Sequence, residues 1–145
     1  MPVAEITLTL RRPWHSQNQL DRLRHGRRAK YRQLMASLAL ELRQQLDSLD
    51  LSDQVFTQCT LLAQRYSTGE LDESNAVGGL KAIQDVLVMQ SSANPYGLGI
   101  IVDDRPDYLE APVVEQIKLK RSESDQSRSE LTLYGELVAR SEIEN

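Results

Sequence analysis

A long segment with helical periodicity lies between two segments of alternating side chains, and this order constrains the fold more than any other feature. From about Ala29 onward, apolar residues recur at helical spacing, which predicts a long helix ending near residue 49. These residues are Leu34, Met35, Leu38, Leu42, Leu46 and Leu49. Residues 3–10 and 55–65 have a period of two, which predicts half-buried strands. The chain must therefore combine helices with a sheet.

Between the first strand and the long helix, and again after the second strand, the pattern changes. Residues 11–26 contain Pro13 and many polar side chains, so we expect a loop there. A second helix is expected after residue 74, N-capped by Asp72 or Ser74. Its expected apolar stripe consists of Val77, Leu80, Ile83 and Leu87, and its glycines Gly78 and Gly79 predict close packing against the sheet.

Two further segments, residues 113–121 and 131–138, alternate and predict strands. The polar stretch that separates them predicts a hairpin with a long loop. The predicted order is β-α-β-α-β-β, which corresponds to a single α+β domain over residues 1–138 and a frayed C-terminal tail over residues 139–145. We expect a mixed sheet with two helices on one face. Its other face would be apolar and exposed, most simply for a second copy of the chain, which predicts a homodimer.

Composition excludes several classes of protein. No apolar run approaches the length of a membrane span, and the first ten residues do not resemble a signal peptide. The single cysteine, Cys59, rules out an internal disulfide framework and lies in an alternating stretch, so we expect it to be buried and inert. A cytoplasmic protein without membrane contact is the expectation.

Charge is distributed very unevenly along the chain. Residues 1–43 contain nine basic and three acidic residues, a net charge of +6, whereas the whole chain carries −4. The densest part contains Arg22, Arg24, Arg27, Arg28, Lys30 and Arg32. Such a cluster is typical of phosphate binding. The alternative is a solvated helix start, although basic residues near a helix N-terminus oppose the helix dipole.

Acidic residues occur in two short groups, Asp72 and Glu73 before the second helix, and Asp103 and Asp104 after a short apolar segment. If the groups converge, their carboxylates could hold Mg²⁺, which binds oxygen ligands and promotes phosphodiester cleavage. Lys81 could then help to bind a phosphate. The alternative is structural, because acids commonly cap helices and form turns. His15 and His25 have no partner at zinc-ligand spacing, so zinc is not expected.

The order of these features resembles the RusA family of Holliday junction resolvases over nearly the whole chain, to about residue 138. The residues that carry the resemblance are "SQN" before the basic stretch, "LDESN" at the start of the second helix, and "GIIVDDRPD". In the family motif Asp-x-Asp-Asn, Asp72 and Asn75 match the first and last positions, and Ser74 replaces the second aspartate. Asp104, with Asp103 beside it, is similar to the later paired aspartates.

The resemblance implies a homodimeric endonuclease of bacterial or phage type that cleaves Holliday and other branched DNA junctions in recombination and repair. It implies Asp72, Asp104 and Lys81 as catalytic residues, and a Mg²⁺ or Mn²⁺ site at Asp72, Glu73, Asp103 and Asp104. Lys81 follows the spacing of some phage members. Because Ser74 brings no negative charge, metal affinity should be weakened.

Two other functions stay open. One is a catalytically weak or inactive relative that keeps DNA binding or a protein interaction, which Ser74 favours. The other is a phage-type adaptor that binds a protein through the exposed face of its sheet.

Overall fold

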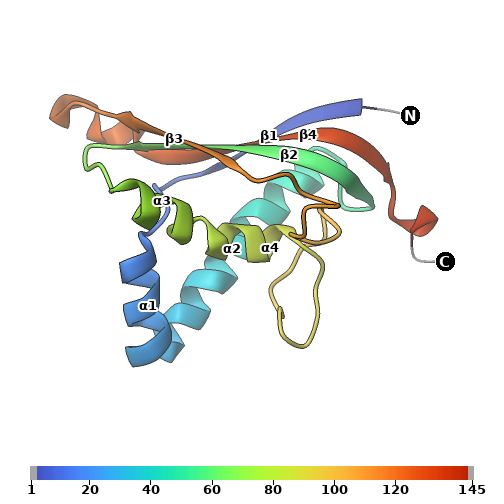
Figure 1. Cartoon of the computed structure of the whole chain (residues 1–145), viewed down its shortest axis with the longest axis horizontal. Helices are drawn as coiled ribbons and strands as arrows, with labels where there is room; N and C mark the ends of the chain where they lie inside the picture. The colour runs from blue at the N-terminus through green and yellow to red at the C-terminus, as the bar shows by residue number, and fades with distance from the viewer. Residues whose placement is uncertain (1–2, 144–145) are drawn as a thin grey trace.

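A four-stranded mixed sheet forms one layer of the molecule, and the helices form the other (Figure 1). The computed structural model describes residues 3–143. The strands are β1 (Val3–Leu10), β2 (Gln54–Ser67), β3 (Val113–Lys118) and β4 (Arg128–Ala139), in the sheet order β1-β4-β2-β3. β4 is antiparallel to both β1 and β2, whereas β3 is parallel to β2.

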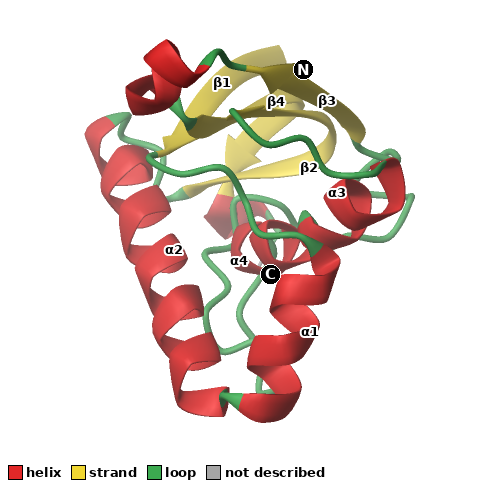
Figure 2. Cartoon of the chain, turned by 90° about the vertical axis from the view of Figure 1, so that its left-hand side faces the viewer, coloured by secondary structure: helices red, strands yellow, loops and turns green. Residues whose placement is uncertain are grey.

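Among residues 3–143, the four α-helices lie on one face of this sheet, and the short 3₁₀ turn η1 (Arg121–Gln126) lies at its end (Figures 1 and 2). The helices are α1 (Gln17–Gly26), α2 (Arg28–Ser48), α3 (Glu73–Gly79) and α4 (Lys81–Leu87), and a second short 3₁₀ turn is η2 (Arg140–Glu142). The predicted single-domain α+β class and mixed sheet are confirmed, and four α-helices replace the two that were expected. α3 and α4 form the crossover that a parallel β2–β3 pair requires.

The core lies between the sheet and the helices. Alternate residues of the strands face inward, including Leu8, Leu10, Leu61, Leu131 and Leu133, each at most 1% exposed. The buried side of α2 is Met35, Leu38, Leu42 and Leu46, as the helical spacing predicts. Burial of these side chains contributes roughly 1.5–3 kcal/mol each. The other two residues of the predicted stripe differ, because Leu34 is only partly buried and Leu49, at the C-cap, is 50% exposed.

The predicted loop at residues 11–26 is wrong in its second half, which forms α1. Ser16 is the N-cap, and Ser16 and Gln19 form a capping box that satisfies two backbone N–H groups. Leu20 is the buried residue of this helix, so no apolar stripe is visible in the sequence. Trp14, in the loop before α1, is also a core residue, and its indole N–H donates to the Ala76 carbonyl at 2.9 Å.

The predicted hairpin between the last two strands is also wrong. β3 and β4 lie on opposite sides of β2, so the connection through η1 passes the end of β2. Alternation defines which residues face the core but carries no information about which strand pairs with which. The second helix divides at Leu80, and the Val77 of its predicted stripe is 50% exposed.

The tandem glycines of α3 pack against the segment that leads into α1 rather than against the sheet. A Cβ atom at Gly79 would collide with the carbonyl oxygen of His15, and one at Gly78 would collide with the Gln17 side chain. The backbone N–H of Asn18 donates to the Asn75 side chain at 3.1 Å. The start of α1 is therefore fixed on α3.

The exposed face of the sheet is mostly polar rather than apolar, although Val3 and Val113 also lie on it. Glu5, Thr7, Thr132 and Glu136 lie on this face, and the Thr7 and Thr132 hydroxyls are 3.0 Å apart. Tyr134 is its exposed aromatic residue, at 53%. A partner for this face would have to satisfy hydroxyl and carboxylate groups.

The first residues of the predicted frayed tail are ordered. Ala139 ends β4, and the Arg140 guanidinium donates to the carbonyls of Leu98 and Gly99 at 3.1 and 3.2 Å. The last two residues of the tail, 144 and 145, lie outside the described residues. Among residues 3–143, no helix has the length and apolar character needed to cross a membrane.

Candidate nucleic-acid interface and carboxylate sites

The basic residues lie at the tip of a helical hairpin that projects away from the sheet. α1 and α2 run side by side and meet at Arg27, whose backbone (φ −143°, ψ 63°) breaks the helix (Figures 1 and 2). The six basic residues, Arg22, Arg24, Arg27, Arg28, Lys30 and Arg32, are all exposed. We call this set the basic tip. The sequence concentrates these charges, and the bend places them at the far end of the molecule.

None of the six basic-tip residues has an ion-pair partner among residues 3–143. Arg24 donates to the Tyr31 hydroxyl at 3.1 Å, and this hydrogen bond is the main reason why its pKa is raised. α2 begins with no side-chain cap and no acidic residue in its first turn. The positive end of the helix dipole therefore adds to the positive charge of the tip.

A shallow groove of about 390 Å³ runs along α1 next to the basic tip. Its lining consists of His15, Gln19, Arg22, Leu23 and Arg27. Burial, and then the nearby Arg12 and Arg65, lower the pKa of His15, so this imidazole is neutral at pH 7. The groove extends the hydrogen-bonding surface of the tip toward the sheet.

Asp72 is the N-cap of α3, as the sequence suggested. Its carboxylate accepts hydrogen bonds from the Asn75 amide side chain at 2.7 Å, the Ser74 hydroxyl at 2.8 Å and the Asn75 backbone N–H at 3.3 Å. The bond from the Asn75 side chain is the largest cause of the lowered pKa of Asp72, followed by the one from Ser74. Both oxygens of Asp72 are thus engaged within its own turn.

Asp104 faces Lys81 at the start of α4. The Lys81 ammonium lies 3.3 Å from its carboxylate, and Asp103 forms an ion pair with Arg105 at 3.0 Å. Burial raises the pKa of Asp104, but hydrogen bonding with Asp103 and with Lys81 outweighs this effect, so that the pKa is lowered overall. Of the three residues expected to be catalytic, Asp72, Asp104 and Lys81, the structure brings Lys81 and Asp104 together.

Asp85 is an acidic neighbour of this pair that the sequence analysis missed. It lies one turn after Lys81 on α4, and burial is the main cause of its raised pKa, with the charges of Lys81, Asp104 and Arg24 also acting on it. Asp85 follows Lys81 by four residues, which places both side chains on one helix face. This spacing could have predicted that the two residues are neighbours.

In this structure, the carboxylates of Asp72, Asp103 and Asp104, which the resemblance implies for a metal site, are engaged in other contacts. Among residues 3–143, no three Asp, Glu, His or Cys side chains gather in an arrangement that could hold a metal ion. Asp72 is held within the first turn of α3, whereas Asp104 pairs with Lys81 at the start of α4. Within the described part of the chain, no hydrogen bond or ion pair joins Asp72 to Asp104.

Cys59 is buried in β2 and free, as predicted. Burial raises the pKa of its thiol to about 12, so the reactive thiolate is not formed at neutral pH.

No protein-family model matches the sequence, and a comparison with curated proteins found no match.

Proposed function

We propose that this protein binds the phosphate backbone of branched DNA through the basic tip. The observation that carries the proposal is the exposure of six basic side chains, without ion-pair partners among residues 3–143, on a hairpin that projects from the domain. Uncompensated basic residues attract phosphates and release the counterions of DNA on binding. The resemblance to junction resolvases supports branched DNA as the preferred form.

The projecting shape of the tip also supports this choice of substrate. A narrow hairpin can enter the space between the arms of a junction, where phosphates of several strands lie close together. The acidic remainder of the chain disfavours general coating of duplex DNA, because it repels phosphates elsewhere on the surface.

Of the functions related to RusA, we favour binding with weak or no cleavage. Ser74 supplies a hydroxyl where the family motif has a carboxylate, and Asp72 is engaged as a helix cap. Mg²⁺-dependent endonuclease activity is the second candidate, favoured by the Lys81–Asp104 pair at 3.3 Å and by the Asp103 beside it.

The binding experiment compares a four-way junction with linear duplex of the same sequence by fluorescence anisotropy. The variant Arg22→Ala, Arg27→Ala, Arg28→Ala should bind the junction about tenfold or more weakly, because three phosphate contacts are lost. A matched control, Arg11→Ala, Arg43→Ala, Arg121→Ala, removes the same charge from exposed positions elsewhere.

The control variant should keep its affinity within about threefold of that of the unmodified protein. Equal losses in both variants would mean that net charge, rather than the tip, determines binding. A parallel incubation of the junction with millimolar Mg²⁺ or Mn²⁺ distinguishes the two candidates, because efficient and symmetric cleavage would establish the endonuclease.

We also propose a homodimer, in line with the resemblance to the RusA family. The polar sheet face means that such a dimer would bury hydroxyl and carboxylate groups along with Tyr134 and Val3. Sedimentation at micromolar concentration tests it, and a monomer at all concentrations would exclude it.

A further inference from the structure

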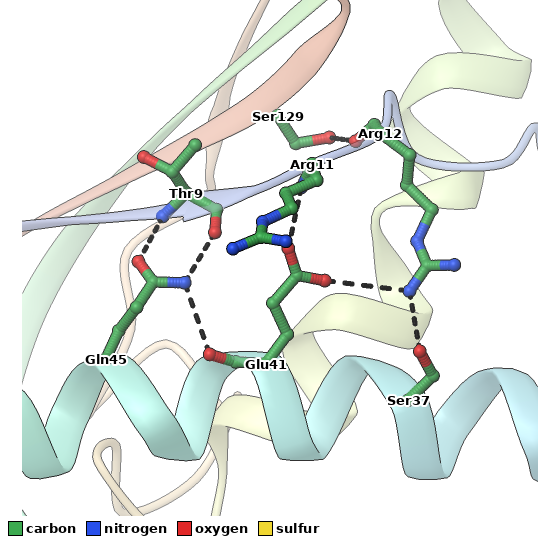
Figure 3. Close-up of polar contacts among 7 residues, drawn as sticks. All are labelled: Thr9, Arg11, Arg12, Ser37, Glu41, Gln45 and Ser129. Atoms are coloured by element: carbon green, nitrogen blue, oxygen red, sulfur yellow. Dashed lines mark hydrogen bonds and ion pairs between the residues drawn. The ribbon is translucent and has the colours of Figure 1, made fainter.

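The two edges of the sheet differ in whether side chains form hydrogen bonds with their outward-facing backbone groups. At the end of β1, the Gln45 side chain of α2 accepts from the N–H of Thr9 at 2.7 Å and donates to its carbonyl at 2.5 Å (Figure 3). One residue beyond the strand, the N–H of Arg11 donates to the Glu41 carboxylate at 2.8 Å. α2 therefore protects this part of the β1 edge from pairing with another strand.

No side chain in the described part of the chain protects the β3 edge in this way. β3 pairs with β2 alone, and the N–H of Leu119 donates to the carbonyl of Ser67 at 2.8 Å, which shows that odd-numbered residues direct their backbone groups toward β2. The backbone groups of Val114, Gln116 and Lys118 therefore point outward. No residue from 3 to 143 forms a hydrogen bond with these outward groups.

A groove of about 390 Å³ lies between this edge and α3, which sits beneath the β3 side of the sheet (Figure 2). Its lining consists of Glu70, Leu71, Glu73, Ala76, Val77, Pro112, Val114 and Gln116. The Gln116 amide is held rigidly, since it exchanges hydrogen bonds of 2.9 and 2.7 Å with the backbone of Leu71. The groove is thus preformed, with Val77 half exposed in its wall.

The charge of this groove is one-sided. Glu70 and Glu73 are exposed and have no ion-pair partner among residues 3–143. No basic side chain lines the groove. An occupant that carries Lys or Arg would be favoured, and nucleic acid would be repelled.

We propose that the β3 edge and this groove bind an extended, basic segment of a partner protein, which adds to the sheet as a further strand. The free backbone groups of Val114, Gln116 and Lys118 supply the hydrogen bonds of a strand ladder. Every second side chain of the added strand enters the groove, where an apolar residue contacts Val77 and a basic residue approaches Glu70 or Glu73. This surface is separate from the basic tip, so the proposal does not depend on DNA binding.

The test uses two blocked heptapeptides and the ¹⁵N-labelled full chain in NMR titrations. The first peptide, Thr-Lys-Thr-Val-Thr-Lys-Thr, presents Lys, Val and Lys on one face of a strand, and the second has Glu in place of both Lys. We expect millimolar Lys peptide to shift the amide signals of Val114, Gln116 and Val77 and to slow hydrogen exchange at Gln116. The Glu peptide should cause no shift.

Charge-reversal variants sharpen the test. The double variant Glu70→Lys, Glu73→Lys should bind the Lys peptide at least about tenfold more weakly and should gain binding of the Glu peptide. In the matched control, Glu115→Lys, the reversed charge lies on β3 but outside the groove, so binding should stay within about twofold.

Three results would overturn the proposal. They are the absence of shifts with either peptide, equal shifts with both peptides, and self-association of the chain through β3, detected by sedimentation together with shifts at Val114 and Gln116 on dilution. The last result would assign the edge to a second copy.

Discussion

The charged side chains of the basic tip and those along α3 and α4 differ in what they already contact. At the tip, six basic residues are exposed and none has an ion-pair partner among residues 3–143. Along α3 and α4, Asp72 caps a helix and Asp104 pairs with Lys81. Charges that are already satisfied within the fold contribute to its stability, whereas unsatisfied ones are available for a ligand.

The basic tip and α3 also differ in where they lie in the fold. The tip is held at a distance from the sheet by two helices, whereas α3 lies against the start of α1 through Gly79 and the hydrogen bond between Asn18 and Asn75. α3 therefore supports the start of the α1–α2 hairpin. Changes along α3 should alter stability first, and changes at the tip should alter binding first.

The largest expected effect is the dependence of DNA affinity on salt. If four of the six basic-tip residues contact phosphates, affinity should fall roughly a hundredfold between about 50 and 200 mM salt. The double variant Asp103→Asn, Asp104→Asn should keep the same salt slope, measured by anisotropy on a four-way junction. If the affinity of the unmodified protein hardly changed with salt, the tip would be a solvated surface that does not bind phosphates. The tip and the charges along α3 and α4 would then not differ in function.

The next effect is on stability. Gly79→Ala should lower the free energy of unfolding by about 1–3 kcal/mol, because the added Cβ collides with the backbone carbonyl of His15. Gly26→Ala at the tip is the control, since no atom lies within 4 Å of the added Cβ. It should be neutral or stabilising by up to about 1 kcal/mol. Urea unfolding measures both, and equal effects would show that α3 is no more constrained than the tip.

A smaller effect is expected from Asp72. Its pKa is lowered in the folded chain, so it stabilises the fold above its unfolded pKa, and this contribution disappears as the pH falls through its folded pKa. Asp72→Ala should lower the melting temperature by a few degrees at pH 7 and by less near pH 2. Asp72→Asn should recover part of the loss, since Asn also caps helices. Calorimetry measures the melting temperatures at both pH values. A larger decrease for Asp72→Ala near pH 2 than at pH 7 would contradict the role of the Asp72 carboxylate as a helix cap.

The smallest effect concerns divalent ions. Because the Asp72 carboxylate is engaged in its helix cap and Asp104 is paired with Lys81, millimolar Mg²⁺ should change the melting temperature by no more than about 1 °C. Ser74→Asp adds a carboxylate beside Asp72, as in the family motif, and should increase both this response and any cleavage of a junction. A shift of several degrees in the unmodified protein would show that the carboxylates converge when metal is present.

Much of the fold could be predicted because its signals are local. Alternation gave the positions of all four strands and the inward direction of Leu8 and Leu10, since side chains alternate across any strand. The α2 stripe and the cap at Asp72 also follow from spacing within one or two turns. The helix α1 had a local signal as well, in the capping box of Ser16 and Gln19, but its nearly uniform polarity hid the periodicity.

By itself, the sequence determined the class of fold, the long helix and the concentration of positive charge before residue 43, because all three depend on neighbouring residues. The tertiary structure alone decided that β4 lies between β1 and β2, that the basic residues project on a hairpin, and that Asp104 pairs with Lys81. Each of these depends on contacts between distant segments. Such contacts are selected by the packing of the whole core, including Trp14 against α3 and Gly79 against His15, and no short pattern encodes that packing.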